Sequence, residues 1–428
     1  MPQARKVNED IHVVRAAFAA TIGNMLEFYD FITYSFFAIQ IGHTFFPAHS
    51  QFGSLMLSLA TFGAGFVTRP IGGVVLGIYS DRIGRRPAML ASFALMGAAI
   101  LVISLTPSYK SIGLAAPIIV IIARMTQGFA LGGEVGPTTA YLMEIASPER
   151  RALVVSWQPT SQEIAATAGA LVGVILSRTM APEALESYGW RIAFLIGAVC
   201  LPFGLWMRSS LPETIPQGDA AAVERSSHLA LARRYIGVIV LALMILASGT
   251  IETYVTQYMT TYAQNTLHMA SSLAFTVSLV SNGLGIAGAL LGGWLADRYG
   301  RKPVMIWPQL VTLLLTYPTF LWIVHVPGAP SLLFGFGVLS LIGSLPFTAF
   351  YATFVEALPQ SIRGGVFATI YAVAIASFGG TAQLVVTWLL HISGNPLAPA
   401  WYLLFAAVVG LIAMSLMPET APIKTREK

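Results

Sequence analysis

Twelve long apolar stretches constrain the fold of this chain more than any other feature of its sequence. A bilayer core of ~30 Å takes about 20 apolar residues per helix, so these stretches occupy most of the 428 residues. Only 10% of the residues are charged, and the mean hydropathy is +0.72, which leaves little chain for a soluble domain. We therefore predict an all-α membrane protein with twelve transmembrane helices. Their centres fall near Ala20, Gly65, Leu95, Gly128, Ala166, Gly197, Ala247, Gly285, Leu314, Leu341, Ala374 and Ala407.

The first apolar stretch follows Arg5 and Lys6, as in a secretory signal. It is too long for a signal and contains Glu27 and Asp30, so we expect a retained first helix. Cys200 is the only cysteine, which excludes an intramolecular disulfide and a metal site built from cysteines. We expect no metal and no bound cofactor.

Lysine and arginine are concentrated in alternate loops between the stretches. We expect the chain to cross the cytoplasmic (inner) membrane many times. By the positive-inside rule, both termini and the long central loop should then lie in the cytoplasm. The same asymmetry accounts for the net charge of +5, so no nucleic-acid partner is expected. The loops with few basic residues contain only Lys110, Arg178 and Arg191. The basic residues of the other loops and of the two chain ends are Arg5, Lys6, Arg15, Arg82, Arg85, Arg86, Arg150, Arg151, Arg208, Arg225, Arg233, Arg234, Arg298, Arg301, Lys302, Arg363, Lys424, Arg426 and Lys428.

The sequence also repeats itself. GIYSDRIGRRP at residues 77–87 returns as GWLADRYGRKP at 293–303, and EIASPERR at 144–151 has the spacing of EALPQSIR at 356–363. LPET before the central loop is echoed by MPET near the end of the chain. Matches in the same order predict two similar halves, residues 1–210 and 232–428, joined by a cytoplasmic linker at 211–231.

Two six-helix halves, each with a Gly-x-x-x-Asp-Arg-x-Gly-Arg-Arg/Lys motif, resemble the major facilitator superfamily over essentially the whole chain. The resemblance implies two pseudo-symmetric bundles that rock around one central site near the membrane midplane. Gly84 and Gly300 suit the tight turns of the motif, whose charges can pair with each other or with helix ends. We expect such pairs to hold the cytoplasmic side shut in one state; alternatively, they only fix topology. The candidate gating residues are Asp81, Arg82, Arg85, Glu144, Arg151, Asp297, Arg298, Arg301, Glu356 and Arg363.

Several charges fall inside the predicted helices, where each costs ~2.5–3.5 kcal/mol near the bilayer centre and is functional by default. The first helix carries four polar residues at a spacing that places them along one gradually rotating face: Asn24, Glu27, Asp30 and Tyr34. We expect this face to point into the helix bundle. The charged candidates are Glu27, Asp30, Arg69, Arg124, Glu134, Glu163 and Glu252.

Arg124 needs a carboxylate or an anionic ligand in this setting. Gly128 and Gly132 lie beside it and would let another helix approach closely. Opposite charges ~4 Å apart attract by about 4 kcal/mol at an effective dielectric of ~20, so we infer that Arg124 pairs with Asp30 or Glu27 when substrate is absent. A static ion pair that only locks two helices together is the alternative.

Five motifs in the first half narrow the resemblance to the metabolite:proton symporter family. They are LEFYDF at 26–31, TRPIGG at 68–73, RxxQGxxxGGE at 124–134, SWQ at 156–158 and GWR at 189–191. Longer runs, such as TFFPAHSQFGSLML, look most like the citrate and tricarballylate branch. The resemblance implies import of such an organic acid with protons by alternating access. We assign proton coupling to Glu27, Asp30 and Glu134. Glu163 and Glu252 depart from that branch, and their roles stay open.

The carried anion should meet the basic residues within the helices. Arg69 and Arg124 are the only ones in the first half, and an Arg fork can bind a carboxylate through two hydrogen bonds. The predicted substrate-binding residues are Arg69, Arg124, Gln127, Gln158 and Gln162 from the first half and Tyr254, Tyr258, Asn282 and Tyr351 from the second. We expect a monomer in the bilayer, with a small organic anion and protons as its partners.

Two other functions remain open at this stage. The first is proton symport of another metabolite: betaine, proline, shikimate or 2-oxoglutarate. The second is export by proton antiport, because the Asp-Arg-x-Gly-Arg motif is shared with efflux proteins. We do not expect an enzyme, because the sequence contains no Gly-x-Ser-x-Gly, His-Glu-x-x-His or phosphate-loop motif.

Overall fold

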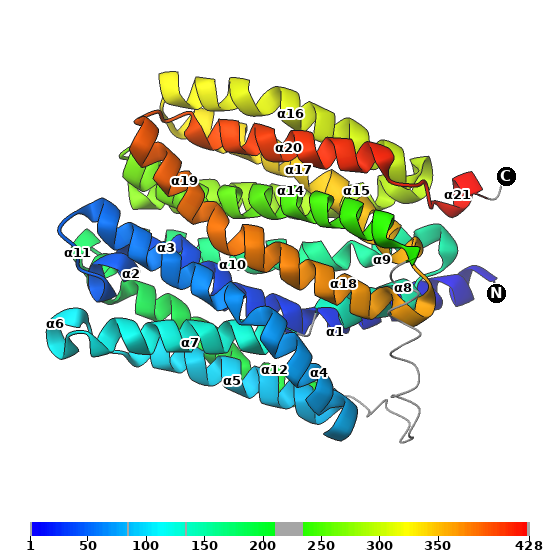
Figure 1. Ribbon diagram of the computed structural model, residues 1–428, viewed down its shortest axis with the longest axis horizontal. Coiled ribbons are helices and arrows are strands. Elements are labelled where there is room, and N and C mark those ends of the chain that lie inside the picture. Colours follow the sequence, from blue (N-terminus) through cyan, green and yellow to red (C-terminus); the bar gives the residue numbers. More distant parts are fainter. Residues whose placement is uncertain (1, 84, 133–134, 210–233, 426–428) are drawn as a thin grey trace.

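The computed structural model describes residues 2–83, 85–132, 135–209 and 234–425, and every regular element in these ranges is a helix (Figure 1). The predicted linker at 211–231 lies outside the described residues. The first half contains α1 (Pro2–Phe36), α2 (Ala38–Phe45), α3 (Gln51–Val67), α4 (Arg69–Ile83), α5 (Arg85–Leu105), α6 (Tyr109–Ile112), α7 (Ala115–Leu131), α8 (Val135–Ile145), η1 (Pro148–Arg150), α9 (Arg151–Val155), α10 (Trp157–Thr179), α11 (Pro182–Ala184), η2 (Leu185–Gly189) and α12 (Trp190–Ser209).

The second half has the same all-helical character. It contains α14 (Ile236–Thr261), η3 (Tyr262–Thr266), α15 (Ser271–Tyr299), α16 (Arg301–His325), α17 (Ala329–Glu356), α18 (Gln360–Ala374), η4 (Ile375–Gly379), α19 (Gly380–Ser393), α20 (Ala398–Leu416) and α21 (Pro422–Thr425). The long helices of both halves run side by side, and the two ends of the chain lie at the same end of the bundle (Figure 1).

Each of the twelve predicted centres falls within one of these helices. Among the described residues, seven helical segments are long and apolar enough to cross a membrane by length and composition. Two shorter apolar helices, Leu90–Leu105 and Ala115–Leu131, accompany them. The prediction of an all-α membrane protein is therefore confirmed.

Several spans are interrupted rather than continuous. The first changes from α1 to α2 at Phe37, the second from α3 to α4 at Thr68, and a short π-helical segment, η4, joins α18 to α19. Residues at such breaks have backbone groups that a regular helix would use internally, so breaks in membrane helices are tolerated where the backbone is buried within protein or faces a cavity. The break at Thr68 has a direct role in placing one candidate site residue.

The two halves contact each other through several pairs of helices. α10 lies along α15, and α3 lies along α19. Near the end where α3 begins, the ring of Phe52 stacks on that of His391 with centroids 3.7 Å apart. At the opposite end, Asp297 of α15 accepts hydrogen bonds from the backbone of α9. The halves thus contact each other near both ends of the bundle.

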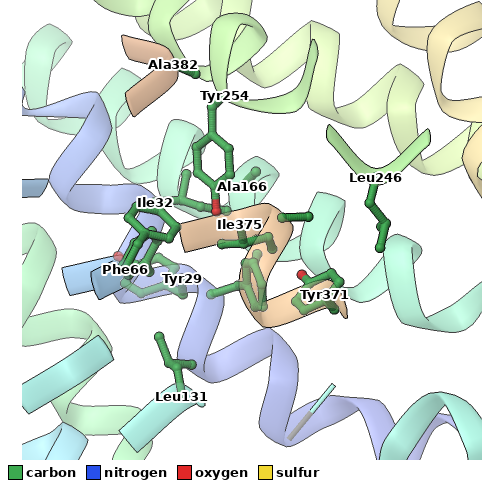
Figure 2. Packing of buried hydrophobic residues seen from close by; sticks show 14 of the residues in the cluster. Tyr29, Ile32, Phe66, Leu131, Ala166, Leu246, Tyr254, Tyr371, Ile375 and Ala382 are labelled. Atoms are coloured by element: carbon green, nitrogen blue, oxygen red, sulfur yellow. The ribbon is translucent and has the colours of Figure 1, made fainter. Parts of the chain in front are cut away.

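The largest cluster of buried apolar side chains crosses this boundary. Figure 2 shows Tyr29, Ile32 and Phe66 of the first half in one group with Tyr254 and Tyr371 of the second half. The rings of Phe66 and Tyr254 meet edge to face, with centroids 5.2 Å apart, a favoured geometry for aromatic pairs. The candidate site is built around this junction.

Candidate substrate and proton site

Glycines bring α3 and α4 into close contact with α7. A Cβ atom on Gly128 would lie 1.4 Å from the carbonyl oxygen of Gly65, and one on Gly132 would lie 2.0 Å from that of Arg69. Neither position could hold a larger residue without moving a backbone. The predicted close helix approach at Gly128 and Gly132 is therefore confirmed, and it draws Arg69 toward Arg124.

The break at Thr68 fixes where Arg69 leaves the second span. The Thr68 hydroxyl, Oγ1, donates a hydrogen bond to the carbonyl oxygen of Met125 on α7 at 2.6 Å. Pro70 follows at the start of α4, where its missing N–H costs no helical hydrogen bond. Arg69 is therefore the first residue of a new helix, pinned against α7.

Both arginines lie buried on aromatic rings. The Arg69 guanidinium carbon is 4.6 Å from the ring centroids of Phe31 and Phe66, and that of Arg124 is 4.4 Å from those of Phe31 and Tyr34. Such cation–π contacts stabilise a guanidinium without using its N–H groups. We call Arg69, Arg124 and these three rings the arginine cluster.

The guanidinium groups keep most of their hydrogen-bonding capacity free. Both side chains are buried, with 3% of Arg69 and 0% of Arg124 exposed. Among the described residues, no hydrogen-bond partner is found for Nε and Nη2 of either arginine. Arg124 uses Nη1 to donate to Oε1 of Gln127 at 2.7 Å. Buried charged donors without acceptors are costly, so this arrangement suits a ligand that brings anionic oxygens.

Two predicted glutamines add further free groups. Nε2 of Gln127 and both amide atoms of Gln158 are buried without a partner in the described structure. Asn24 donates to the Ser161 hydroxyl at 2.7 Å, while its own Oδ1 has no partner. The first half therefore offers both donors and acceptors to a polar ligand.

Asp30 lies beside this group but makes no ion pair with Arg124. It is 1% exposed, its Oδ1 has no partner, and a Cβ atom on Gly197 of α12 would lie 2.2 Å from that oxygen. No Asp30–Arg124 contact within 4.0 Å occurs among the described residues. The predicted direct pair is wrong for Asp30, because this face of α1 turns the carboxylate toward α12. The Glu27 side chain and Glu134 lie outside what the structure describes.

A cavity of about 100 Å³ separates the two halves near the arginine cluster. Four predicted binding residues line it, Gln162, Tyr254, Asn282 and Tyr351, together with both unassigned acids, Glu163 and Glu252. Arg69, Arg124, Gln127, Gln158 and Tyr258 are not part of this lining. Most of the predicted site residues thus lie in or beside two adjoining groups, the cavity and the arginine cluster.

Tyr254 connects these two groups. Its ring packs on those of Phe62 and Phe66 while it also lines the cavity. Phe66 in turn carries the Arg69 guanidinium, whose carbon is 4.6 Å from the centroid of its ring.

The other second-half candidates have different surroundings. Asn282 donates to the carbonyl oxygen of Ser278 at 2.6 Å, which leaves its side-chain oxygen for the cavity. Tyr258 accepts a hydrogen bond from Thr387 at 3.0 Å and belongs to a separate apolar cluster. The predicted role of Tyr258 in substrate binding is not tested, and its position away from the cavity lining does not favour that role.

Two polar residues were missed by sequence reasoning. Tyr371 of α18 lines the cavity, and its hydroxyl accepts a hydrogen bond from Nε2 of Gln162 at 3.3 Å. Gln383 of α19 donates to the Ser35 hydroxyl of α1 at 2.6 Å, across the boundary between the halves. For Gln383, a polar residue inside an otherwise apolar stretch was the available signal, whereas a tyrosine such as Tyr371 gives none.

Three gating candidates of the second half, Asp297, Arg301 and Glu356, form a network at the end of the bundle that holds both chain termini. Oδ1 and Oδ2 of Asp297 accept from the backbone N–H groups of Ala152 and Leu153 at 3.0 and 2.9 Å. A carboxylate at a helix N-terminus is favoured by the helix dipole. Arg301 pairs with Asp297 at 2.7 Å and with Glu356 at 3.0 Å. The second-half motif therefore bonds directly to the first half.

The remaining gating candidates lie at other positions. Arg298 is exposed and lies over the rings of Trp294 and Tyr299. Glu144 lies on α8, and Arg151 begins α9, beside the Asp297 contacts. The side chains of Asp81, Arg82, Arg85 and Arg363 lie outside the described residues, so their gating role stays a prediction.

Comparison with known proteins agrees with this architecture. The chain is 35% identical to a citrate–proton symporter of Salmonella typhi over 404 residues, which cover 94% of this chain and 93% of that protein. The chain belongs to the metabolite:proton symporter family of the major facilitator superfamily. It is also 34% identical to the alpha-ketoglutarate permease of Escherichia coli (strain K12), over 94% of this chain and 93% of that protein.

The family membership confirms the predicted resemblance and the twelve-helix fold. The family description "sugar (and other) transporter" matches residues 16–216. Among solved structures, a D-xylose–proton symporter superposes with a TM-score of 0.76 at 18% identity, covering 96% of this chain and 98% of that one. This likeness shows that the fold is shared.

Proposed function

We propose that the protein is a proton-coupled symporter that imports a tricarboxylate or dicarboxylate, such as citrate or tricarballylate, by alternating access. The observation that carries the proposal is the set of four buried guanidinium nitrogens, on Arg69 and Arg124, that lack a partner among the described residues. A polycarboxylate carries several anionic oxygens within one small molecule, so a single ligand can accept hydrogen bonds from more than one of these nitrogens. The citrate–proton symporter relative supports the same cargo class.

The charge of the cargo requires a coupling cation. Moving one negative charge into an inside-negative cell costs ~2.3 kcal/mol per 100 mV, so a trianion alone would be driven out. Asp30 is a buried carboxylate in the same half as the arginine cluster, and it makes no ion pair with Arg124. Asp30 carries a proton together with the cargo in this scheme, because a protonated carboxyl is neutral when buried and leaves Arg124 to pair with the anion.

Alternation between the two faces would use the network at Asp297. Opening at that end must break the Asp297 hydrogen bonds to Ala152 and Leu153, while Arg301 can keep its bonds to Asp297 and Glu356, which lie in its own half. We further propose that this end faces the cytoplasm, that the membrane is the cytoplasmic one, and that the protein works as a monomer. The basic loops of the sequence support that orientation.

Uptake into vesicles tests the proposed function. Purified protein in proteoliposomes should accumulate radiolabelled citrate or tricarballylate when an inward proton gradient is imposed, and the accumulation should collapse when a protonophore is added. Unlabelled 2-oxoglutarate, proline and betaine serve as competitors. Uptake that only a zwitterion inhibits, or no gradient-driven uptake of any acid, would refute the proposal.

A further inference from the structure

Glu163 and Glu252 face the central cavity from opposite halves, and the coupling scheme through Asp30 gives neither a role. Glu163 is on α10 and Glu252 on α14. Both carboxylates lie directly against glycines of neighbouring helices. A Cβ atom on Gly285 would lie 2.7 Å from Oε2 of Glu163, and one on Gly343 would lie 2.2 Å from Oε1 of Glu252. Any larger residue at either glycine would displace a carboxylate.

The described lining of the cavity provides no basic side chain to balance these acids. It contains no lysine, arginine or histidine, and neither glutamate forms an ion pair within 4.0 Å in the described part of the chain. Oε2 of Glu163 is buried and has no hydrogen-bond partner there. Two carboxylates without counter-charge around one small cavity are stable when protonated, because a buried unpaired charge is costly.

The other titratable and charged groups nearby do not replace that counter-charge. The tyrosines Tyr254, Tyr351 and Tyr371 line the same cavity and are neutral donors or acceptors. On α1, Asp30 faces Gly197 of α12 instead of the cavity, and the guanidinium groups belong to the arginine cluster, outside the lining. The described lining residues of α15, α16 and α20 carry no charge.

Polar atoms without partners continue the cavity into the second half. Gln257, 5% exposed, lines the cavity with a free Oε1. Glu252 also borders a smaller pocket between α14, α16, α17 and α20, in which the hydroxyls of Ser248 and Thr312 have no partner among the described residues. Such polar surroundings suit ordered water, which can deliver and remove protons.

We propose that Glu163 and Glu252 form a second proton site, which carries protons together with the substrate in addition to Asp30. This inference rests on the proposed symport. Each carboxylate takes one proton from water on the outer side, forming an O–H bond, and returns it to water on the inner side when the halves part there. Because the two acids belong to different halves, the parting of the halves itself hydrates them and favours release.

The number of protons moved per substrate tests this assignment. In proteoliposomes clamped at zero membrane potential, the slope of the logarithm of the equilibrium citrate ratio against the pH difference reports that number. Each proton lost should lower the ratio about tenfold per pH unit. We expect a lower slope for Glu163→Gln and for Glu252→Gln, and the lowest for the double variant. Glu183→Gln, an exposed acid on α11, is the matched control.

Exchange of internal for external citrate separates the failure of this inference from the failure of the symport itself. No exchange by the unaltered protein would refute the proposed function. Exchange with an unchanged slope in the double variant would refute the second proton site alone. Glu163→Asp and Glu252→Asp keep a carboxylate and should keep the full slope; a slope as low as that of the Gln variants would show that cavity shape, and not the proton, is responsible.

Discussion

At the scale of single residues, the candidate site is defined by polar atoms that the protein itself leaves without partners. Arg69 and Arg124 rest on aromatic rings that hold the guanidinium groups in place yet accept none of their N–H groups. A structural ion pair would use those groups internally. Rings on one side and free donors on the other therefore favour a ligand site over a static lock.

Arg124→Ala should lower substrate affinity enough to remove uptake at the concentrations that the unaltered protein transports, while leaving the protein in the membrane. A hydrogen bond to a charged group contributes about 1.5–3 kcal/mol, so losing one such contact lowers affinity by roughly 10- to 100-fold. Arg124→Lys should also fail, because an ammonium cannot reproduce the planar fork. Substrate affinity measured by competition in proteoliposomes checks this, with the exposed Arg178→Ala as control. Wild-type affinity in Arg124→Ala would remove Arg124 from the site.

Asp30→Asn should keep exchange of internal for external substrate but lose accumulation driven by a proton gradient. The amide has nearly the shape of the carboxylate, so it fits against Gly197, but it cannot take up a proton. Parallel assays of exchange and of gradient-driven uptake check the separation. Undiminished accumulation would show that Asp30 is not a proton carrier.

The sequence predicted some residues of the site better than their contacts. Charged residues inside apolar stretches pointed to Arg69, Arg124 and Asp30, because burial of charge is costly wherever it occurs. The partner of Asp30 was not predictable, since helical periodicity gives a face of α1 but not the helix that this face meets. Tyr371 was missed for a related reason: a tyrosine in an apolar stretch is ordinary until its neighbours are known.

At the scale of elements, close helix packing at glycines is what places the two arginines. Gly65 and Gly128 let α3 approach α7 backbone to backbone. This contact was predictable from the small residues beside Arg124, which are typical of membrane helix interfaces. The break at Thr68 was not predictable from hydropathy, because the apolar stretch continues through it.

Gly128→Ala should destabilise the protein and displace Arg124. The new Cβ atom would lie 1.4 Å from the carbonyl oxygen of Gly65, far inside van der Waals contact, so the helices must separate. Gly283→Ala is the matched control, because a Cβ atom there meets nothing within 4 Å, and it should be neutral or slightly stabilising. Thermal unfolding midpoints of the purified variants check both. Equal midpoints would contradict the packing described here.

At the scale of the whole molecule, the halves contact each other near both ends and line a cavity between them. One end is held by stacked rings, Phe52 on His391, and the other by Asp297 bonded to the backbone of α9. The repeated motif predicted a closing role for the Asp297 end, whereas the aromatic contacts at the other end follow no motif. Alternating access then requires each set of contacts to open in turn.

Asp297→Asn should favour opening at its own end. The two backbone N–H groups bond to different oxygens of Asp297, and in the amide one of these atoms becomes an NH2 donor, so one bond is lost together with the charge that pairs with Arg301. Ser156 is buried at this boundary beside Gly293, so the alkylation rate of a Ser156→Cys reporter in a Cys200→Ser background should rise. Arg298→Ala, an exposed neighbour, should leave the rate unchanged. An unaltered rate in Asp297→Asn would exclude this contact as a gate.

The direction of proton movement during transport tests the central claim most directly. Citrate added outside proteoliposomes that have no imposed gradient should carry protons inward. A pH-sensitive dye inside the proteoliposomes should then report more acidification than citrate itself causes as a buffer. Arg124→Ala should abolish the signal. Alkalinisation of the interior would identify an antiporter, and citrate entry without any proton signal would contradict coupled symport.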